Sequence, residues 1–218
     1  MSVARQRDGV YALPEADFAR EAAGPSDISM PIAVTELGDE IVWRPEADLW
    51  PHLHLDGPIG SGKTITAQNI AVAAARARWR VHILRQFDRE YGEFLGWPNV
   101  EVATTPTEHS ALLQRSVDLM YPIPAAPLLV VIDTIKGIVD GIGDSCRGPL
   151  RRIALDGRVH QAHLVLIADP TASDPVPEVT ELLCPLTVIP PPLASSRRPR
   201  GDLMRWRPGQ YSAGPLPR

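Results

Sequence analysis

The chain has 218 residues, which suffice for one sizeable hydrophobic core and are too few for two ordinary catalytic domains. Hydrophobic residues make up 44% of the sequence and charged residues 22%, a balance that is typical of globular proteins and excludes a disordered or fibrous chain. The formal net charge of -4 excludes nucleic-acid binding through bulk positive charge and leaves only local basic patches for that purpose.

Nothing in the sequence indicates membrane insertion or export. The longest apolar run, around residues 128–132, is far shorter than the roughly 20 residues that a membrane-spanning helix needs. The first residues turn polar where a signal peptide would carry its apolar stretch. Cys146 and Cys184 lie far apart and outside any CxxC pattern, so two reduced thiols are expected. We therefore expect a cytoplasmic protein without a membrane span of its own.

Composition divides the chain into three segments. Residues 1–30 mix charged and small residues without a sustained period and are expected to form a weakly ordered N-terminal arm. Residues 31–189 carry regular strand and helix patterns and are expected to form the core. Residues 190–218 are rich in proline and arginine and begin with three prolines, which cannot continue a sheet interior. A last edge strand is expected within this segment, at residues 202–206.

Strand and helix patterns alternate along the core. Residues 32–35 and 41–43, joined by a loop that contains a glycine, predict a β-hairpin. Short apolar runs predict strands at residues 51–57, 81–84, 100–103, 128–132, 163–168 and 186–189. Helical spacing and capping residues predict helices at residues 63–78, at residues 107–120 with Thr107 as the N-cap, and at residues 148–157.

Several of these strands are apolar on both faces and alternate with helices. Strands of this kind are buried on both sides, as in a parallel sheet that helices cover on both faces. The sequence therefore predicts an α/β fold with a mostly parallel sheet, helices on both faces and a small N-terminal β-hairpin.

The strongest chemical signal is the run Gly57-Pro58-Ile59-Gly60-Ser61-Gly62-Lys63-Thr64. It fits the P-loop pattern G-x-x-x-x-G-K-[ST] in full and lies between a predicted strand and a predicted helix. Such a loop points successive backbone N–H groups at phosphate oxygens, at the positive end of the following helix. Lys63 would reach the β- and γ-phosphates of ATP, and the Thr64 hydroxyl would hold Mg²⁺. ATP and Mg²⁺ are therefore the expected cofactors.

Asp133 follows the apolar run of residues 128–132, where a P-loop site needs an acid to orient the magnesium shell. The next residue is Thr134, whereas a motor ATPase usually has a glutamate there to activate the attacking water. Threonine can hydrogen-bond to water but cannot accept its proton at neutral pH. Nucleotide binding is expected and fast hydrolysis is not. Whether Asp140 or a neighbouring subunit supplies a substitute base stays open.

The wider pattern resembles the FtsK/SpoIIIE-type DNA-translocase ATPases over about residues 30–207. Residues 51–57 resemble the family's P-H-L-L-V-A-G run, residues 151–168 its segment around a Gly-Arg step, and residues 200–204 its closing R-G-D-M-L strand. The resemblance implies a RecA-like P-loop core that assembles into a homo- or hetero-oligomeric ring around double-stranded DNA. It further implies that ATP turnover moves the duplex, in plasmid or mobile-element transfer.

The chain departs from that family at positions that matter for hydrolysis. Thr134 stands at the place of the catalytic glutamate, and Asp169 at the place of the glutamine that senses the γ-phosphate. Residues 85–87, Arg-Gln-Phe, replace an acidic D-P-K element. Arg158, in the Gly157-Arg158 step, is a candidate to stabilise charge on a neighbouring subunit's nucleotide. A surface arginine at a helix end is the alternative interpretation.

Weaker features have ordinary structural explanations. The basic run at residues 195–200 could contact DNA phosphates, and a solvated loop is the commoner reason for such a cluster. His52 and His54 share a strand face, but no cysteine or carboxylate completes a zinc site, so structural roles are expected. One tryptophan could stack on adenine, and the others are expected to pack. The five tryptophans are Trp43, Trp50, Trp79, Trp97 and Trp206.

Three functions stay open from the sequence. The first is a DNA-translocase ATPase, which the motifs and their order favour. The second is an ATP-binding regulatory or assembly subunit that does not hydrolyse ATP, which the missing glutamate favours. The third is a small-molecule kinase, for which residues 147–152 would be a poor arginine-bearing lid.

Overall fold

The computed structural model describes residues 6–7, 10–11, 27–34, 40–46, 50–87, 90–121, 125–169 and 173–187. Most of the expected N-terminal arm lies outside these ranges. The whole of residues 190–218 also lies outside them, including the expected edge strand at 202–206 and the basic run at 195–200. The division of the chain at residues 30 and 189 therefore stays a prediction.

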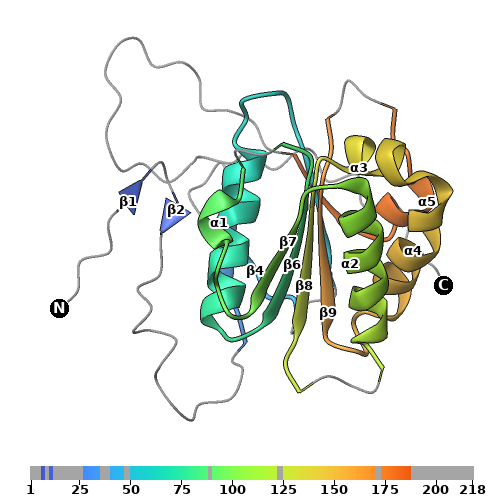
Figure 1. The fold of residues 1–218 in the computed structure, drawn as a ribbon. Helices are drawn as coiled ribbons and strands as arrows, with labels where there is room; N and C mark the ends of the chain where they lie inside the picture. The colour runs from blue at the N-terminus through green and yellow to red at the C-terminus, as the bar shows by residue number, and fades with distance from the viewer. Residues whose placement is uncertain are drawn as a thin grey trace, which may run out of the picture.

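A six-stranded parallel sheet forms the centre of the molecule (Figure 1). Its strands lie side by side in the order β10-β5-β9-β8-β6-β7. The P-loop strand β5 and the strand β8 that ends at Asp133 are not neighbours, because β9 lies between them. The strands are β5 (Leu53–Asp56), β6 (Arg80–Arg85), β7 (Val100–Ala103), β8 (Leu128–Asp133), β9 (Ala162–Ile167) and β10 (Cys184–Thr187).

Helices cover both faces of the sheet, as predicted. Helix α1 (Lys63–Arg76) and the 3-10 turn η2 (Gly92–Phe94) lie on one face, and the remaining helices lie on the opposite face (Figure 1). Successive side chains of β8 alternate between the two sides: Leu129 packs with α1, and Val130 packs in the opposite core. The second layer contains α2 (Pro106–Asp118), α3 (Ile135–Ile142), the 3-10 turn η3 (Gly143–Cys146), α4 (Arg147–Asp156) and α5 (Pro177–Thr180).

The predicted hairpin is present as β3 (Met30–Val34) and β4 (Glu40–Trp43), which pair antiparallel. Trp43 is buried in the core on the α1 side, and its indole N–H donates to the carbonyl of Trp50 at 2.9 Å. A second, very short antiparallel pair joins β1 (Gln6–Arg7) to β2 (Val10–Tyr11), and β2 contacts α1. The hairpin thus extends the core beyond the central sheet.

Helix α2 begins earlier than the sequence predicts. Its N-cap is Thr105 and not Thr107, because Thr105 and Glu108 form a reciprocal capping box and Pro106 occupies the first helical position. Helix α3 was not predicted at all: it is short and contains two glycines, which weaken the helical pattern. In the ranges described, no helix is both long and apolar enough to cross a membrane.

Buried histidines hold neighbouring elements together. His52 donates from Nε2 to the carbonyl of Ala154 at 3.1 Å, and its Nδ1 accepts the backbone N–H of Leu164 at 3.0 Å. Burial, with a smaller effect of His163, lowers the pKa of His52 to about 3. Burial, with Arg115 and Arg80, lowers the pKa of His82 to about 4. Within the described ranges no cluster of histidine, cysteine and acidic residues could hold a metal ion.

We expect the free energy of unfolding to decrease as the pH falls below 6.5. In the unfolded chain both histidines protonate around pH 6.5, whereas in the folded chain His52 and His82 stay neutral down to about pH 3 and 4. The unfolded state therefore binds more protons within this window. Each histidine contributes about 1.4 kcal/mol per pH unit there.

Urea unfolding of the protein and of the variant His52→Gln, measured between pH 7 and pH 4.5, tests this expectation. The variant removes one titrating group, so its stability should depend less steeply on pH than that of the unaltered chain. Equal slopes for the two proteins would contradict the assignment of this pH dependence to His52.

Candidate nucleotide-binding site

The P-loop connects the end of β5 to the start of α1. Gly60 and Gly62 have φ of 79° and 98°, a left-handed conformation that glycine adopts without strain. The N–H of Ser61 donates to the carbonyl of Pro58 at 3.1 Å and closes the turn. Helix α1 has no acidic residue in its own first turn, so the helix sequence does not neutralise its positive end. This geometry suits a bound anion.

Two polar side chains of the loop are ready for phosphate contacts. Lys63 is 9% exposed, and its ammonium group folds back to donate to the carbonyls of Gly57 and Pro58. The Ser61 hydroxyl is buried and has no hydrogen-bond partner among the described residues. A buried hydroxyl without a partner is costly, and a phosphate oxygen would supply the missing acceptor.

Asp133 lies at the end of β8 and is 2% exposed. Its carboxylate accepts hydrogen bonds from three hydroxyl groups. Tyr91 donates to Oδ2 at 3.0 Å, Thr134 donates to Oδ1 at 3.3 Å, and Thr64 also donates to this carboxylate. Burial raises the pKa of Asp133, while these three donors and the charge of Lys63 act in the opposite direction. The Thr64 hydroxyl and the Asp133 carboxylate are oxygen ligands in direct contact, so they fit the preference of Mg²⁺.

A cavity of about 560 Å³ opens at this edge of the sheet. The P-loop, the segments after β6, β8 and β9, and helix α3 line it. Seven of the residues singled out from the sequence come together there: Ile59, Gly60, Lys63, Thr64, Asp133, Thr134 and Asp169. Asp140 also lines the cavity, but its carboxylate pairs with Lys136 at 2.7 Å.

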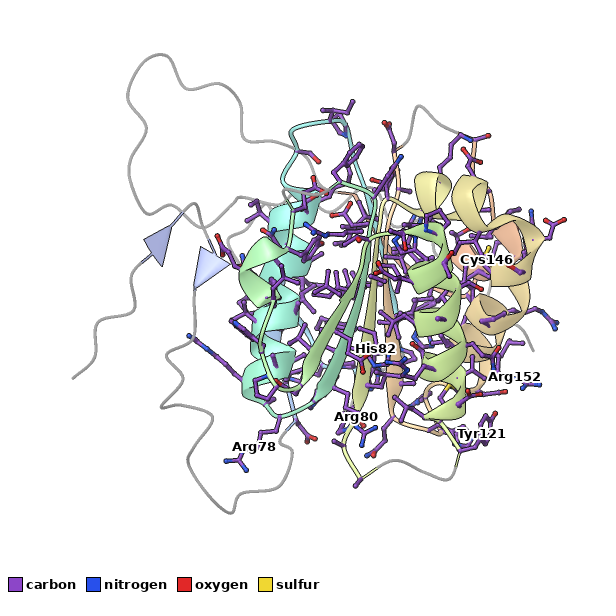
Figure 2. All side chains as sticks on the ribbon, viewed as in Figure 1. Arg78, Arg80, His82, Tyr121, Cys146 and Arg152 are labelled. Atoms are coloured by element: carbon purple, nitrogen blue, oxygen red, sulfur yellow. The ribbon has the colours of Figure 1, made fainter. Side chains whose placement is uncertain are left out.

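Arg158 is not part of this site. It is exposed and lies between α4 and the first residue of β9, at the amino-terminal edge of the sheet. The six residues of β9 place that edge about 20 Å from the P-loop. Figure 2 shows Arg80, Tyr121 and Arg152 at the same edge. A role for Arg158 at a nucleotide therefore requires a neighbouring subunit.

The segment after β6 contributes residues that the sequence analysis missed. Phe87 and Glu90 line the cavity. Tyr91 is buried, and its hydroxyl group donates to the Asp133 carboxylate. Burial raises the pKa of Glu90, the charge of Asp133 raises it further, and Arg85 opposes both. Their position in the sequence could have indicated them, because an acidic residue and aromatic residues follow a predicted strand. The carboxyl ends of parallel strands meet at one edge of a sheet, where ligands bind.

Trp206 lies outside the described residues, and the four described tryptophans lie away from the cavity. Trp79 stacks on His163 with ring centroids 5.1 Å apart, and Trp97 packs on Phe94. No tryptophan among the described residues lines the cavity; its aromatic residue is Phe87, which is 55% exposed. A second cavity of about 640 Å³ lies between α2 and the α3–α4 segment, and no charged residue lines it. The phosphate-binding geometry is therefore confined to the first cavity within the described ranges.

Comparison with known proteins supports the fold. No protein-family model matches the sequence, and no curated protein matches it. Among solved structures, the chain is similar to EccC (ATPases 2 and 3) of Thermomonospora curvata in complex with a signal sequence peptide. The sequences are 17% identical and the TM-score is 0.58, over 84% of this chain and 37% of that chain.

Two further structures are similar at comparable levels. EssC (ATPases 2 and 3) from Geobacillus thermodenitrificans is 14% identical, with a TM-score of 0.57, over 87% of this chain and 39% of that one. The pCW3 conjugation coupling protein TcpA with ATPgS is 13% identical, with a TM-score of 0.57, over 84% of this chain and 58% of that one. The chain thus spans less than two thirds of each. It has the fold of these P-loop ATPase domains, which confirms the predicted RecA-like core.

We expect Tyr91→Phe to destabilise the protein by about 1–2 kcal/mol, because Asp133 loses one of its three hydroxyl donors in a buried environment. This corresponds to a decrease in Tm of about 2–8 °C for a domain of this size. Thermal unfolding followed by circular dichroism measures it.

Tyr121→Phe is the matched control. Tyr121 also donates its hydroxyl to an aspartate, Asp156 at 3.2 Å, but the side chain is 46% exposed and lies at the opposite edge of the sheet (Figure 2). Its removal should change stability by no more than about 0.5 kcal/mol. Equal decreases in Tm for the two variants would refute a special role for the buried pair.

Proposed function

We propose that this chain is an Mg²⁺-dependent, ATP-binding domain of the motor type that works within an assembly that moves a macromolecule. One observation carries the proposal: Lys63 and Thr64 of the P-loop converge with Asp133 of β8 on one cavity at the carboxyl edge of the sheet. Strand order sets this convergence, and open α/β sheets bind their ligands at this edge.

Each residue has a distinct role in the proposed complex. The backbone N–H groups of residues 60–64 and the positive end of α1 bind the phosphates. Lys63 leaves the carbonyls of Gly57 and Pro58 and neutralises the β- and γ-phosphates. The Thr64 hydroxyl would be a ligand of Mg²⁺, and Asp133 would orient the water molecules around the ion. Mg²⁺, when bound, neutralises the charge that develops on the phosphate oxygens.

The proposed cargo is double-stranded DNA. The sequence resemblance at residues 51–57 and 151–168 supports it, and so does the structural similarity to a conjugation coupling protein. The similarity to EccC, solved with a signal sequence peptide, makes a protein cargo the alternative. In a ring of subunits, Arg158 would approach a neighbour's nucleotide, since it lies too far from the cavity of its own chain.

The second candidate function is ATP binding without hydrolysis, in a regulatory or assembly subunit. Thr134 and Asp169 favour it, because neither reproduces the residue of the family that the sequence resembles. The kinase interpretation loses its support. Residues 147–152 begin the packed helix α4, which does not line the cavity, and Arg147 pairs with Asp144 and Glu178.

Lys63→Ala should weaken ATP binding about 10- to 100-fold, because it removes a charge-assisted contact to the phosphates. Isothermal titration calorimetry with ATP and Mg²⁺ measures the affinity. The control is Arg76→Ala, which removes an exposed cation from the other end of α1 and should leave the affinity unchanged. If Lys63→Ala bound ATP as tightly as the unaltered chain, the P-loop proposal would be wrong.

Double-stranded DNA should increase the steady-state rate of ATP hydrolysis, and the increase should shrink as salt rises, because phosphate contacts release counterions. Release of inorganic phosphate measures the rate with and without DNA at 50 and 200 mM salt. Tight ATP binding with no effect of DNA at either concentration would exclude DNA as the cargo.

A further inference from the structure

The site lacks an obvious proton acceptor for the water that attacks ATP. Thr134 follows Asp133 directly and cannot act as a base at neutral pH. Four acidic residues line the cavity: Glu90, Asp133, Asp140 and Asp169. Any base that this chain itself supplies from the described residues must come from this set.

Asp133 and Asp140 each have identified partners. Asp133 accepts hydroxyl groups from three residues and is the carboxylate that orients the metal's water shell in the proposed complex. Asp140 forms an ion pair with Lys136 on α3, and its side chain is 59% exposed. Asp169 follows β9, which lies between the P-loop strand β5 and β8. In the sequence comparison with the FtsK/SpoIIIE-type ATPases, it stands at the position of the γ-phosphate sensor.

Glu90 is held beside Asp133 by its neighbours. Strand β6 pairs directly with β8, with Arg85 opposite Asp133, so the segment after β6 passes the end of β8. Arg85 donates from its guanidinium group to the backbone carbonyl of Glu90. The backbone N–H of Glu90 donates to the backbone carbonyl of Phe87 at 3.3 Å. The next residue, Tyr91, is anchored on Asp133. The backbone of Glu90 is thus restrained on both sides.

The carboxylate of Glu90 has capacity left for a ligand. The residue is half-buried and lines the cavity, and its Oε2 is a buried oxygen without a hydrogen-bond partner among the described residues. A buried carboxylate oxygen needs a donor, and a water molecule in the cavity would provide one. The cavity wall therefore offers an acceptor in the segment that follows β6, the strand next to β8.

We propose that Glu90 is the general base of ATP hydrolysis in this chain, in place of a glutamate at position 134. This proposal rests on the proposed function. The water oxygen forms a bond to the γ-phosphorus as the bond from that phosphorus to the β–γ bridging oxygen breaks. The bridging oxygen leaves on ADP with the electron pair. The water proton passes to the Glu90 carboxylate, which later returns it to solvent as inorganic phosphate departs.

The test compares Glu90→Gln with Glu93→Gln in the full chain. Glutamine keeps the shape of the side chain but cannot accept the proton. Glu93 lies on the same segment, is exposed and does not line the cavity, so it is a matched control. Phosphate release at saturating ATP and Mg²⁺ gives kcat, and calorimetric titration gives the ATP affinity of each protein.

Glu90→Gln should lower kcat at least 100-fold and change the ATP affinity less than about twofold, because a general base acts on the chemical step and not on binding. Glu93→Gln should change neither. An unchanged kcat in Glu90→Gln would overturn the proposal, and Asp169→Asn would then identify the rival base. Loss of ATP binding or of the folded state in Glu90→Gln would also count against it, by assigning Glu90 to binding or folding.

The outcome is separable from that of the proposed function. If the unaltered chain binds ATP through Lys63 but releases no phosphate, with or without DNA, Glu90 is not a base and the regulatory function stands. If Lys63→Ala leaves binding unchanged, the proposed function itself fails. A lowered kcat with intact binding supports both proposals together.

Discussion

Burial of the Asp133 carboxylate is the constraint around which the carboxyl edge of the sheet is built. A carboxylate removed from water needs several donors or a counter-charge, since otherwise it would be strongly destabilising. Hydroxyl groups reach it from three separate segments: Thr64 from α1, Tyr91 from the segment after β6, and Thr134 from its own segment. One acidic group thereby ties the P-loop helix and two neighbouring strand ends together.

Strand order supplies the space that a triphosphate needs. Because β9 lies between β5 and β8, these two strands are two strand spacings apart, which is about 9.6 Å. Asp169, at the end of β9, lies across this gap, and the segment after β6 closes its far side. Most of the cavity lining thus comes from segments at the carboxyl ends of the strands, with helix α3 adding the rest, and the sheet sets the separation of these segments.

The same arrangement bears on the proposed hydrolysis, because no glutamate directly follows Asp133 in this chain. In a parallel sheet, neighbouring strands end at the same edge, so the segment that follows β6 brings Glu90 to the cavity that Asp133 and Thr134 also line. The register sets Arg85 opposite Asp133, and Arg85 in turn holds the backbone of Glu90. Loss of a motif residue on one strand is therefore compatible with supply of the same chemical group by the next.

Local patterns in the sequence determined the P-loop, the acid at the end of β8 and the parallel sheet covered on both faces. Each of these depends on residues close together in the chain: glycines that permit a left-handed turn, or an apolar run that alternates between two cores. The sequence alone did not reveal α3, the N-cap Thr105 or the contributions of Glu90 and Tyr91.

The tertiary structure decided the order of the strands and, with it, which loops meet. The six strands pair in an order that differs from their order in the chain, because crossover helices carry the chain over its own sheet. Glu90 lies 43 positions before Asp133 in the sequence, yet both line the same cavity. Arg158 belongs to a recognisable motif, but the direction of β9 places it at the far edge. Such juxtapositions depend on the packing of the whole chain, which no local period encodes.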